Sequence, residues 1–225
     1  MNVGIVVAAG KSERVGANVD KAFLSLGTKP VLAYSLLAFE KCKDIDAVVL
    51  VVRKDRVEGA RAMAQMYGAS KVTRVVAGGG KRQVSVQKGI DSLPDDTKVV
   101  SVHDGARPCV TPEIISETIK CAKRYGSGVA GVKLTDTIKY VERGVTVKKT
   151  IDRDKLWAVQ TPQTFKLDLL QKAFDAVQKK KVTVTDEAQA VELVSNEVRL
   201  VPSVLSNIKI TTADDLMLAA ALLKL

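Results

Sequence analysis

Short apolar runs alternate with longer amphipathic segments through the first half of the chain. Residues 3–9 and 47–52 are almost continuously apolar, as in strands that are buried on both faces of a sheet. Between them, Val31, Leu32 and Leu36 recur at helical spacing. The pattern predicts strands over 3–9, 47–52, 72–76 and 99–102, and helices over 30–43, 57–67, 84–93 and 111–125. This βαβα order predicts an α/β fold with a mostly parallel sheet and helices on both faces.

The pattern changes after residues 129–134. Residues 137–141 and 146–151 flank Glu142-Arg143-Gly144 and predict a β-hairpin. Both arms are polar and rich in lysine, and a hairpin this long is unstable alone in water, so we expect it to pack on a partner subunit; the alternative is a solvated flap. The remaining predicted elements are helices over 167–179, 185–194 and after Thr212, and a strand over 198–201.

The loop after the first predicted strand is the first candidate site. Parallel sheets bind ligands beyond the carboxyl ends of their strands. Here Gly10 and Gly16 allow close backbone approach, and Lys11, Arg14 and Lys21 add positive charge, which suits an anion. The glycine spacing fits neither a Walker A loop nor the dinucleotide fingerprint. The alternative is an ordinary turn with solvated charges.

Two further clusters follow later predicted strands. Three successive glycines, 78–80, precede Lys81, Arg82 and Ser85, and such a backbone could lie against a base or ribose; the alternative is a flexible connector. Asp104 ends another strand, where a carboxylate could hold magnesium beside phosphate oxygens. Its alternative role is an ion pair with Arg107, and His103 is expected to be structural.

Composition narrows the ligand class. Lys plus Arg is 35 against 25 for Asp plus Glu, so the formal charge of +10 favours an anionic ligand. Only 4% of residues are aromatic, which is poor for stacking unpaired bases, so we expect small phosphorylated ligands rather than nucleic acid. Three separate cysteines, no secretory signal and no apolar run long enough for a membrane predict a cytoplasmic protein.

Three polar clusters in the second half are ambiguous when taken singly. Residues 150–163 could form a turn, 185–187 a helix cap, and 207–211 a strand with one exposed lysine. Their order is more informative. The segments that follow one another are AAGxxxR, Lys21, GGxxRxxSV, HDxARP, DTIK, TIDRxxLW, QTPQxF, TDEA and NIKIT.

This series, spread over residues 3–223, closely resembles the 2-C-methyl-D-erythritol 4-phosphate cytidylyltransferase family of the non-mevalonate isoprenoid pathway. The resemblance implies one Rossmann-like nucleotidyltransferase domain over residues 1–225, in which residues 136–152 form a β-arm that joins a homodimer. It implies transfer of CMP from CTP to the acceptor phosphate, with Mg²⁺ or another divalent cation. No membrane or nucleic-acid partner is implied.

The resemblance also implies roles for individual residues. Catalysis is assigned to Arg14, Lys21 and Lys209. Nucleotide binding is assigned to Ala8, Ala9, Gly10, Gly79, Gly80, Ser85, Asp104 and Gly105, and Asp104 is also the metal candidate. Acceptor binding is assigned to Arg107, Thr137, Arg153, Thr161 and Thr185, of which Thr137 and Arg153 are carried on the arm into the neighbour's site.

The chain departs from the family pattern at a few positions. Asp20 stands where proline is usual, and we expect its carboxylate to weaken the hold of Lys21 on phosphate. Gly80 replaces a usual aspartate, which removes a side-chain contact. Two other functions stay open from the sequence: cytidylyl transfer to ribitol 5-phosphate, and a non-catalytic nucleotide- or RNA-binding module.

Overall fold

A seven-stranded sheet forms the centre of the protein in a computed structural model that describes residues 1–10 and 20–225. The strand order is β11-β7-β10-β6-β1-β4-β5. Strand β10 runs antiparallel to both of its neighbours, and the other described pairs are parallel, so the sheet is mostly parallel as predicted. The strands are β1 (Asn2–Ala8), β4 (Ala47–Val52), β5 (Val72–Ala77), β6 (Val99–Asp104), β7 (Ser127–Lys133), β10 (Trp157–Lys166) and β11 (Leu200–Pro202).

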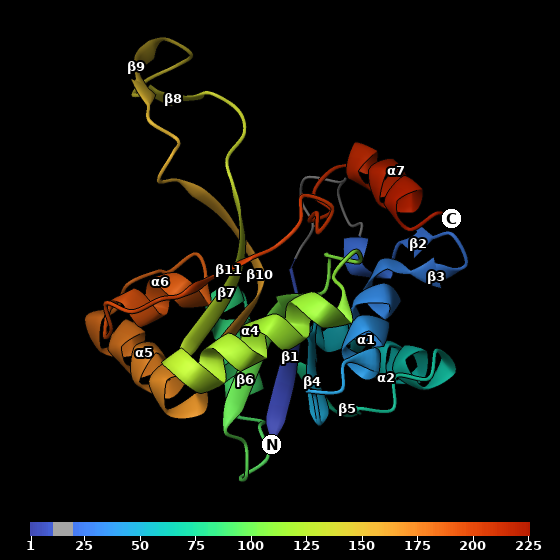
Figure 1. The fold of residues 1–225 in the computed structure, drawn as a ribbon. Helices are drawn as coiled ribbons and strands as arrows, with labels where there is room; N and C mark the ends of the chain where they lie inside the picture. The colour runs from blue at the N-terminus through green and yellow to red at the C-terminus, as the bar shows by residue number, and fades with distance from the viewer. Residues whose placement is uncertain (11–19) are drawn as a thin grey trace.

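Helices cover both faces of this sheet (Figure 1). Along β4, Val48 and Leu50 pack in one core with α1, α2 and α4, whereas Val49 and Val51 pack in the other with α3, α5 and α6. This two-residue alternation explains why β4 is apolar throughout. The helices are α1 (Val31–Lys41), α2 (Val57–Met66), α3 (Arg82–Ile90), α4 (Pro112–Tyr125), α5 (Leu167–Lys180), α6 (Glu187–Glu192) and α7 (Ala213–Leu222), with 3₁₀ turns η1 (Lys21–Phe23) and η2 (Lys54–Arg56).

Helix ends follow the sequence signals. Thr111 caps α4 by accepting a hydrogen bond from the Ile114 amide, with Pro112 at the first position, as predicted. Thr212 and Asp215 form a capping box at α7. Helix α6 is shorter than predicted because Asp186 caps it, which places Thr185 in the preceding loop. No helix in the described ranges is long and apolar enough to cross a membrane.

The turn interpretation of residues 150–163 is confirmed only at residues 154–155, because residue 151 ends a strand and residues 157–166 form β10 inside the sheet. Its polar side chains find partners inside the protein: the Thr164 hydroxyl lies 2.9 Å from Ser101 Oγ and 2.8 Å from Thr118 Oγ1. The strand interpretation of residues 207–211 was wrong, since this segment is a loop.

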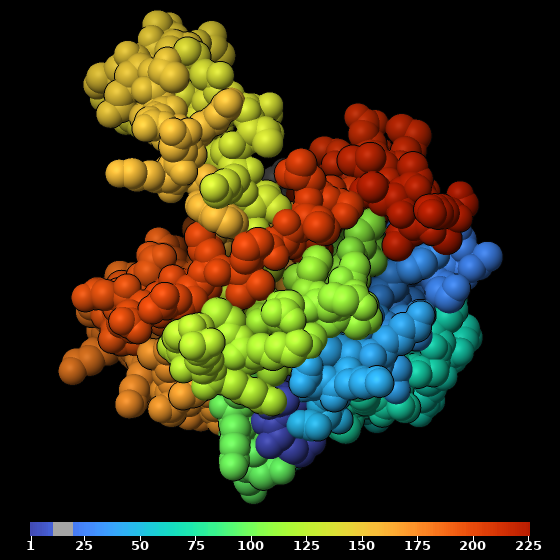
Figure 2. Space-filling model, viewed as in Figure 1, coloured from blue at the N-terminus to red at the C-terminus, as the bar shows by residue number. Residues whose placement is uncertain are grey.

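The predicted hairpin is present as β8 (Ile138–Val141) and β9 (Val147–Ile151). It projects away from the sheet and its helices, and most of its side chains are exposed (Figures 1 and 2). A second small pair, β2 (Ser25–Leu26) with β3 (Lys29–Pro30), lies before α1. The hairpin packs little of its surface on the described remainder of the chain, which leaves it available to contact something else.

Gly128 provides a stability prediction. A Cβ at this buried β7 position would lie 2.3 Å from the Thr118 carbonyl oxygen and 2.9 Å from Cys121 Cβ on α4. We therefore expect Gly128→Ala to lower the free energy of unfolding by about 1–3 kcal/mol in urea denaturation. Gly59→Ala in α2 is the matched control: a Cβ there meets nothing within 4 Å, so a gain of about 0.5–1 kcal/mol is expected. Equal effects of the two substitutions would contradict this packing.

Candidate active site

A cleft with a volume of about 1210 Å³ opens at the carboxyl ends of β1, β5 and β6. The sequence predicted that the residues after these strands would meet, and they do. The described lining residues are Val7, Ala8, Ala9, Gly10, Asp20, Lys21, Ala22, Arg53, Lys54, Asp55, Gly78, Gly79, Gly80, Lys81, Arg82, Ser85, Asp104, Ala106 and Lys209. Six of these residues are basic and three are acidic, so the described lining of the cleft favours binding of a polyanion.

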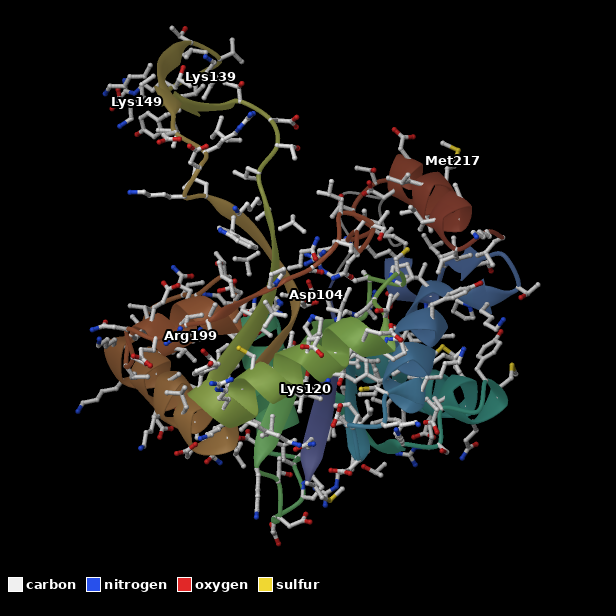
Figure 3. All side chains as sticks on the ribbon, viewed as in Figure 1. Asp104, Lys120, Lys139, Lys149, Arg199 and Met217 are labelled. Atoms are coloured by element: carbon white, nitrogen blue, oxygen red, sulfur yellow. The ribbon has the colours of Figure 1, made fainter. Side chains whose placement is uncertain are left out.

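Asp104, labelled near the middle of the molecule in Figure 3, lines the cleft and pairs with two of its basic side chains. Its Oδ1 is 3.1 Å from Arg82 Nε, and its Oδ2 is 2.7 Å from Lys209 Nζ. Arg107 Nε is more distant, at 3.9 Å from Oδ2. Burial opposes ionisation of Asp104, but the charges of Arg82 and Lys209 outweigh burial and hold the pKa of this carboxyl well below its usual range. Asp104 is therefore an anion at neutral pH.

Arg82 also pairs with Glu187, the first residue of α6. Its Nη1 and Nη2 lie 2.5 Å and 3.0 Å from the two carboxylate oxygens of Glu187. Burial opposes the charge on Arg82, yet Glu187 and Asp104 raise the pKa of its guanidinium above the ordinary value. The side chain is fixed between two carboxylates, one of which lines the cleft.

Lys209 reaches the cleft from a loop that is hydrogen-bonded to the segment after β6 and to β10. The Ile210 amide donates to the Ala106 carbonyl at 2.8 Å, and Arg107 Nη1 donates to the Asn207 carbonyl at 2.7 Å. The buried Asn207 side chain donates to the Thr161 carbonyl at 2.9 Å. These hydrogen bonds hold Lys209 in position, although it lies in neither a helix nor a strand. Arg107 thus faces the loop, and the structure does not include it in the cleft lining.

The glycine loop is held against the end of β1. A Cβ at Gly78 would lie 2.4 Å from Ala9 Cβ, so only glycine permits this approach. The Gly79 amide donates to Ser85 Oγ at 3.0 Å, and Ser85 Oγ donates to the Lys81 carbonyl at 3.2 Å. Gly80 has open space around it. Ser85 therefore shapes the loop from inside the cleft.

His103 and Thr161 lie beneath the cleft rather than in it. Both are buried, with His103 Nδ1 3.0 Å from Thr161 Oγ1 and the Asp104 amide donating to the same oxygen at 3.0 Å. Gly105 is likewise packed under the cleft, where its amide donates to the Val7 carbonyl. His103 is structural, as expected, and Thr161 holds the backbone of Asp104.

The environment of His103 predicts a pH dependence of stability. Burial lowers the pKa of His103 to about 3, so between this value and about 6.5 the unfolded chain binds a proton that the folded chain does not. Stability therefore rises with pH through this window, and the free energy of unfolding should fall by about 2 kcal/mol from pH 7 to pH 5. Urea denaturation of the wild type and His103→Gln measures it: the variant should lack this part of the slope, and equal slopes would contradict the assignment.

The acceptor-side candidates lie at the base of the hairpin and before α6. Thr137 and Arg153 are exposed, and Arg153 Nη1 donates to the Thr135 carbonyl across the two hairpin strands' bases. Thr185 is also exposed and donates to Gln189 Oε1 at 3.1 Å. None of the three lines the described part of the cleft. Arg14, with residues 11–19, lies outside the described residues.

Asp20 and Cys109 are both buried near the cleft end of the sheet. Asp20 is buried, its Oδ2 lies 3.9 Å from Arg56 Nε, and burial raises the pKa of its carboxyl. Its described ion-pair partner is thus on η2. Cys109 is buried with Ile210 and Ala219, and burial raises the pKa of its thiol to about 11, so it is not a thiolate at neutral pH.

Arg82 and Glu187 belong to two of the sequence motifs, GGxxRxxSV and TDEA, but the sequence alone gave neither of them a role in the site. The sequence feature that could have indicated Arg82 is its position two residues after the three glycines, where it begins α3. Glu187 gave no such signal, because an acidic residue in the first turn of a helix is usually exposed and favoured by the helix dipole. Only the fold brings it within reach of an arginine that is 105 positions away.

An α/β sheet with a basic cleft at the carboxyl ends of its parallel strands places the protein in the class of α/β proteins whose cleft suits a phosphorylated ligand. Comparison with known proteins makes the class specific. The sequence profile of the 2-C-methyl-D-erythritol 4-phosphate cytidylyltransferase (IspD) family matches residues 2–225. The chain belongs to this family.

Individual relatives agree over nearly the whole length. The 2-C-methyl-D-erythritol 4-phosphate cytidylyltransferase of Dehalococcoides mccartyi is 43% identical over 220 residues, covering 98% of this chain and 95% of the relative. The one from Alkaliphilus oremlandii is 40% identical over 221 residues, covering 98% and 94%. A crystal structure of 4-diphosphocytidyl-2C-methyl-D-erythritol synthase from Anaerococcus prevotii superposes with a TM-score of 0.88 at 29% identity, covering 100% of this chain and 96% of that chain.

Proposed function

We propose that this protein transfers CMP from CTP to 2-C-methyl-D-erythritol 4-phosphate, giving 4-diphosphocytidyl-2-C-methyl-D-erythritol and pyrophosphate. Membership of the family over residues 2–225 supports the reaction. The observation in the structure that carries it is the convergence of Lys209 and Arg82 on Asp104 in a cleft lined by basic residues. The reaction brings two polyanions together, and this cleft supplies the fixed charge that the encounter needs.

The chemistry requires no general base. A phosphate monoester has its second pKa near 6, so the acceptor is largely a dianion at neutral pH and attacks the α-phosphorus directly. The contribution of the protein is orientation and charge stabilisation. We assign Lys21 and Lys209 to the charge that develops around the α-phosphate, and Arg14 to the departing pyrophosphate. The neutral, buried His103 takes no part.

The part of the cleft that we assign to the nucleotide is lined by glycine and alanine residues, which leave the backbone accessible. Residues 8–10 and the glycine loop with Ser85 line one wall, and we assign cytosine and ribose to it. Gly78 packs so closely on Ala9 that only glycine is accommodated, and we assign the base to the backbone of these two segments. Because Gly80 offers no side chain, any contact at this position comes from the backbone.

A divalent cation fits this cleft only as a partner of the nucleotide. Asp104 is the central carboxylate, and the described residues contain no group of three or more His, Cys, Asp or Glu side chains that could hold a metal. Magnesium commonly binds through one or two carboxylates and the substrate's phosphates, so Asp104 would hold it together with the triphosphate. The ion would neutralise charge on the phosphate oxygens.

The acceptor is assigned to a site completed by a second subunit. Thr137 lies in the projecting β-arm, residues 136–152, and Arg153 directly follows this arm. Both side chains are exposed in the single chain. A homodimer through these arms would bring them to the partner's cleft, beside Thr185. In this proposal residues 1–225 form one catalytic domain that works in the cytoplasm without nucleic acid or membrane.

Product analysis tests the proposed reaction. Incubation with CTP, Mg²⁺ and 2-C-methyl-D-erythritol 4-phosphate should consume the acceptor's monoester ³¹P signal and produce two coupled diphosphate signals together with pyrophosphate. Incubation without the acceptor is the control. Release of inorganic phosphate in place of pyrophosphate, or no change in the acceptor signal, would contradict the proposal.

A further inference from the structure

The loop before α6 contacts the start of α3 at one side of the cleft, and the reaction as described makes no use of this contact. The Val184 amide donates to Gln83 Oε1 at 3.0 Å, and Lys81 Nζ lies 3.4 Å from Thr183 Oγ1. The two segments are about a hundred residues apart in sequence. Their contact joins the end of the glycine loop to the loop that carries Thr185.

The strongest link in this contact is the ion pair between Arg82 and Glu187. Glu187 is only 1% exposed, and both of its oxygens accept from the guanidinium, in a planar two-bond arrangement that fixes the orientation of arginine. The Nε–H group of the same guanidinium is thereby directed at Asp104 Oδ1. Asp104 Oδ2 is left to Lys209. The four side chains form one continuous chain of charges that alternate in sign.

We propose that Glu187 is a positioning residue for the cytidylyl transfer proposed above, on which this inference rests. It never meets the substrates. It holds Arg82, Arg82 holds Asp104, and Asp104 sets where the Lys209 ammonium lies before the phosphates arrive. Displacement of a reacting group by about 1 Å can cost about 10²-fold in rate, so the orientation supplied by a buried carboxylate has a kinetic consequence.

Glu187→Gln is the direct test. The glutamine amide keeps the shape but presents an NH₂ group to one of the guanidinium's N–H groups, so one of the two bonds is replaced by a clash of donors. We expect kcat to fall by at least about tenfold while the KM for CTP changes by less than about threefold, because the loss affects geometry in the transition state. Glu192→Gln, an exposed position at the other end of α6, should leave kcat unchanged.

Two more variants separate positioning from folding. Glu187→Asp retains a carboxylate and should recover part of the lost kcat. The double variant Arg82→Met with Glu187→Leu removes both buried charges of the pair, so its unfolding midpoint should be close to that of the wild type even if Glu187→Gln is destabilised. Its kcat should stay low, because Asp104 Oδ1 then lacks the guanidinium that holds it.

The outcomes separate the inference from the function on which it rests. Wild-type protein that releases pyrophosphate, with Glu187→Gln slowed and Glu187→Asp partly restored, supports the positioning role. Wild-type activity with Glu187→Gln within about threefold in kcat overturns it, as does a double variant with wild-type kcat. Absence of pyrophosphate release by the wild-type protein overturns the proposed function itself, whatever the variants do.

Discussion

The Lys209→Ala variant should lose about 10²–10³-fold in kcat while it remains folded. Lys209 Nζ lies 2.7 Å from Asp104 Oδ2 in the cleft. In the proposed reaction this cation stabilises the charge that develops on the transferred phosphate. Removal of one preorganised contact of this kind costs about 2.7–4 kcal/mol of transition-state stabilisation. The fold should tolerate the loss, because the side chain is partly exposed and Asp104 keeps its ion pair with Arg82.

Steady-state pyrophosphate release measures the loss, and thermal unfolding checks that the variant is intact. Lys172→Ala is the matched control, since Lys172 is exposed on α5 and lies outside the cleft lining. It removes the same charge from the protein and should leave kcat unchanged. A Lys209→Ala enzyme with near-normal kcat would show that this lysine does not act on the phosphates.

A mixture of two nearly inactive variants should regain about a quarter of wild-type activity if each arm completes the partner's site. The first variant is Lys209→Ala, and the second is Arg153→Ala, which should lose at least about tenfold because a charged hydrogen bond to the acceptor phosphate is removed. In random dimers half of the molecules contain both variants. One of the two sites in each such molecule then combines an intact cleft with an intact arm.

Co-expression of the two variants with different affinity tags also isolates the mixed dimers, and in this purified fraction the expected activity rises to about half of the wild type, because one of the two sites in every molecule is intact. The controls are the two variants expressed and assayed singly at the same concentration. If the arm served its own subunit, every site in the mixture would carry a defect, and activity would stay at the level of the single variants. That result, or a monomer by light scattering, would contradict the proposed dimer.

The sequence predicted the elements whose burial follows a simple rule. Strand β4 is apolar throughout because α-helices cover both faces of the sheet, and the predicted bounds of residues 47–52 are those observed. Strand β10 was missed for the opposite reason. Its buried positions include four polar residues, Gln160, Thr161, Gln163 and Thr164. They are tolerated because Ser101, Thr118 and other partners satisfy their hydrogen bonds.

The same distinction applies to the site. Residues that directly follow a buried strand, such as Gly10 and Asp104, could be placed at the cleft from the strand pattern alone. Lys209 entered through a motif resemblance, because the loop around it is fixed by side-chain bonds to Asn207 and Arg107 rather than by a regular element. Glu187 is brought to Arg82 by tertiary packing, and no local sequence pattern predicts such a contact.

The most direct test of the central claim is pyrophosphate release from CTP and Mg²⁺ with 2-C-methyl-D-erythritol 4-phosphate or ribitol 5-phosphate as the acceptor. Release with the methylerythritol phosphate, and none with the ribitol phosphate, is the expected result. Release only with ribitol phosphate would keep the nucleotide cleft but contradict the acceptor roles of Thr137 and Arg153. Failure to release pyrophosphate with either acceptor, while the chain binds RNA in a salt-dependent way, would contradict the account as a whole.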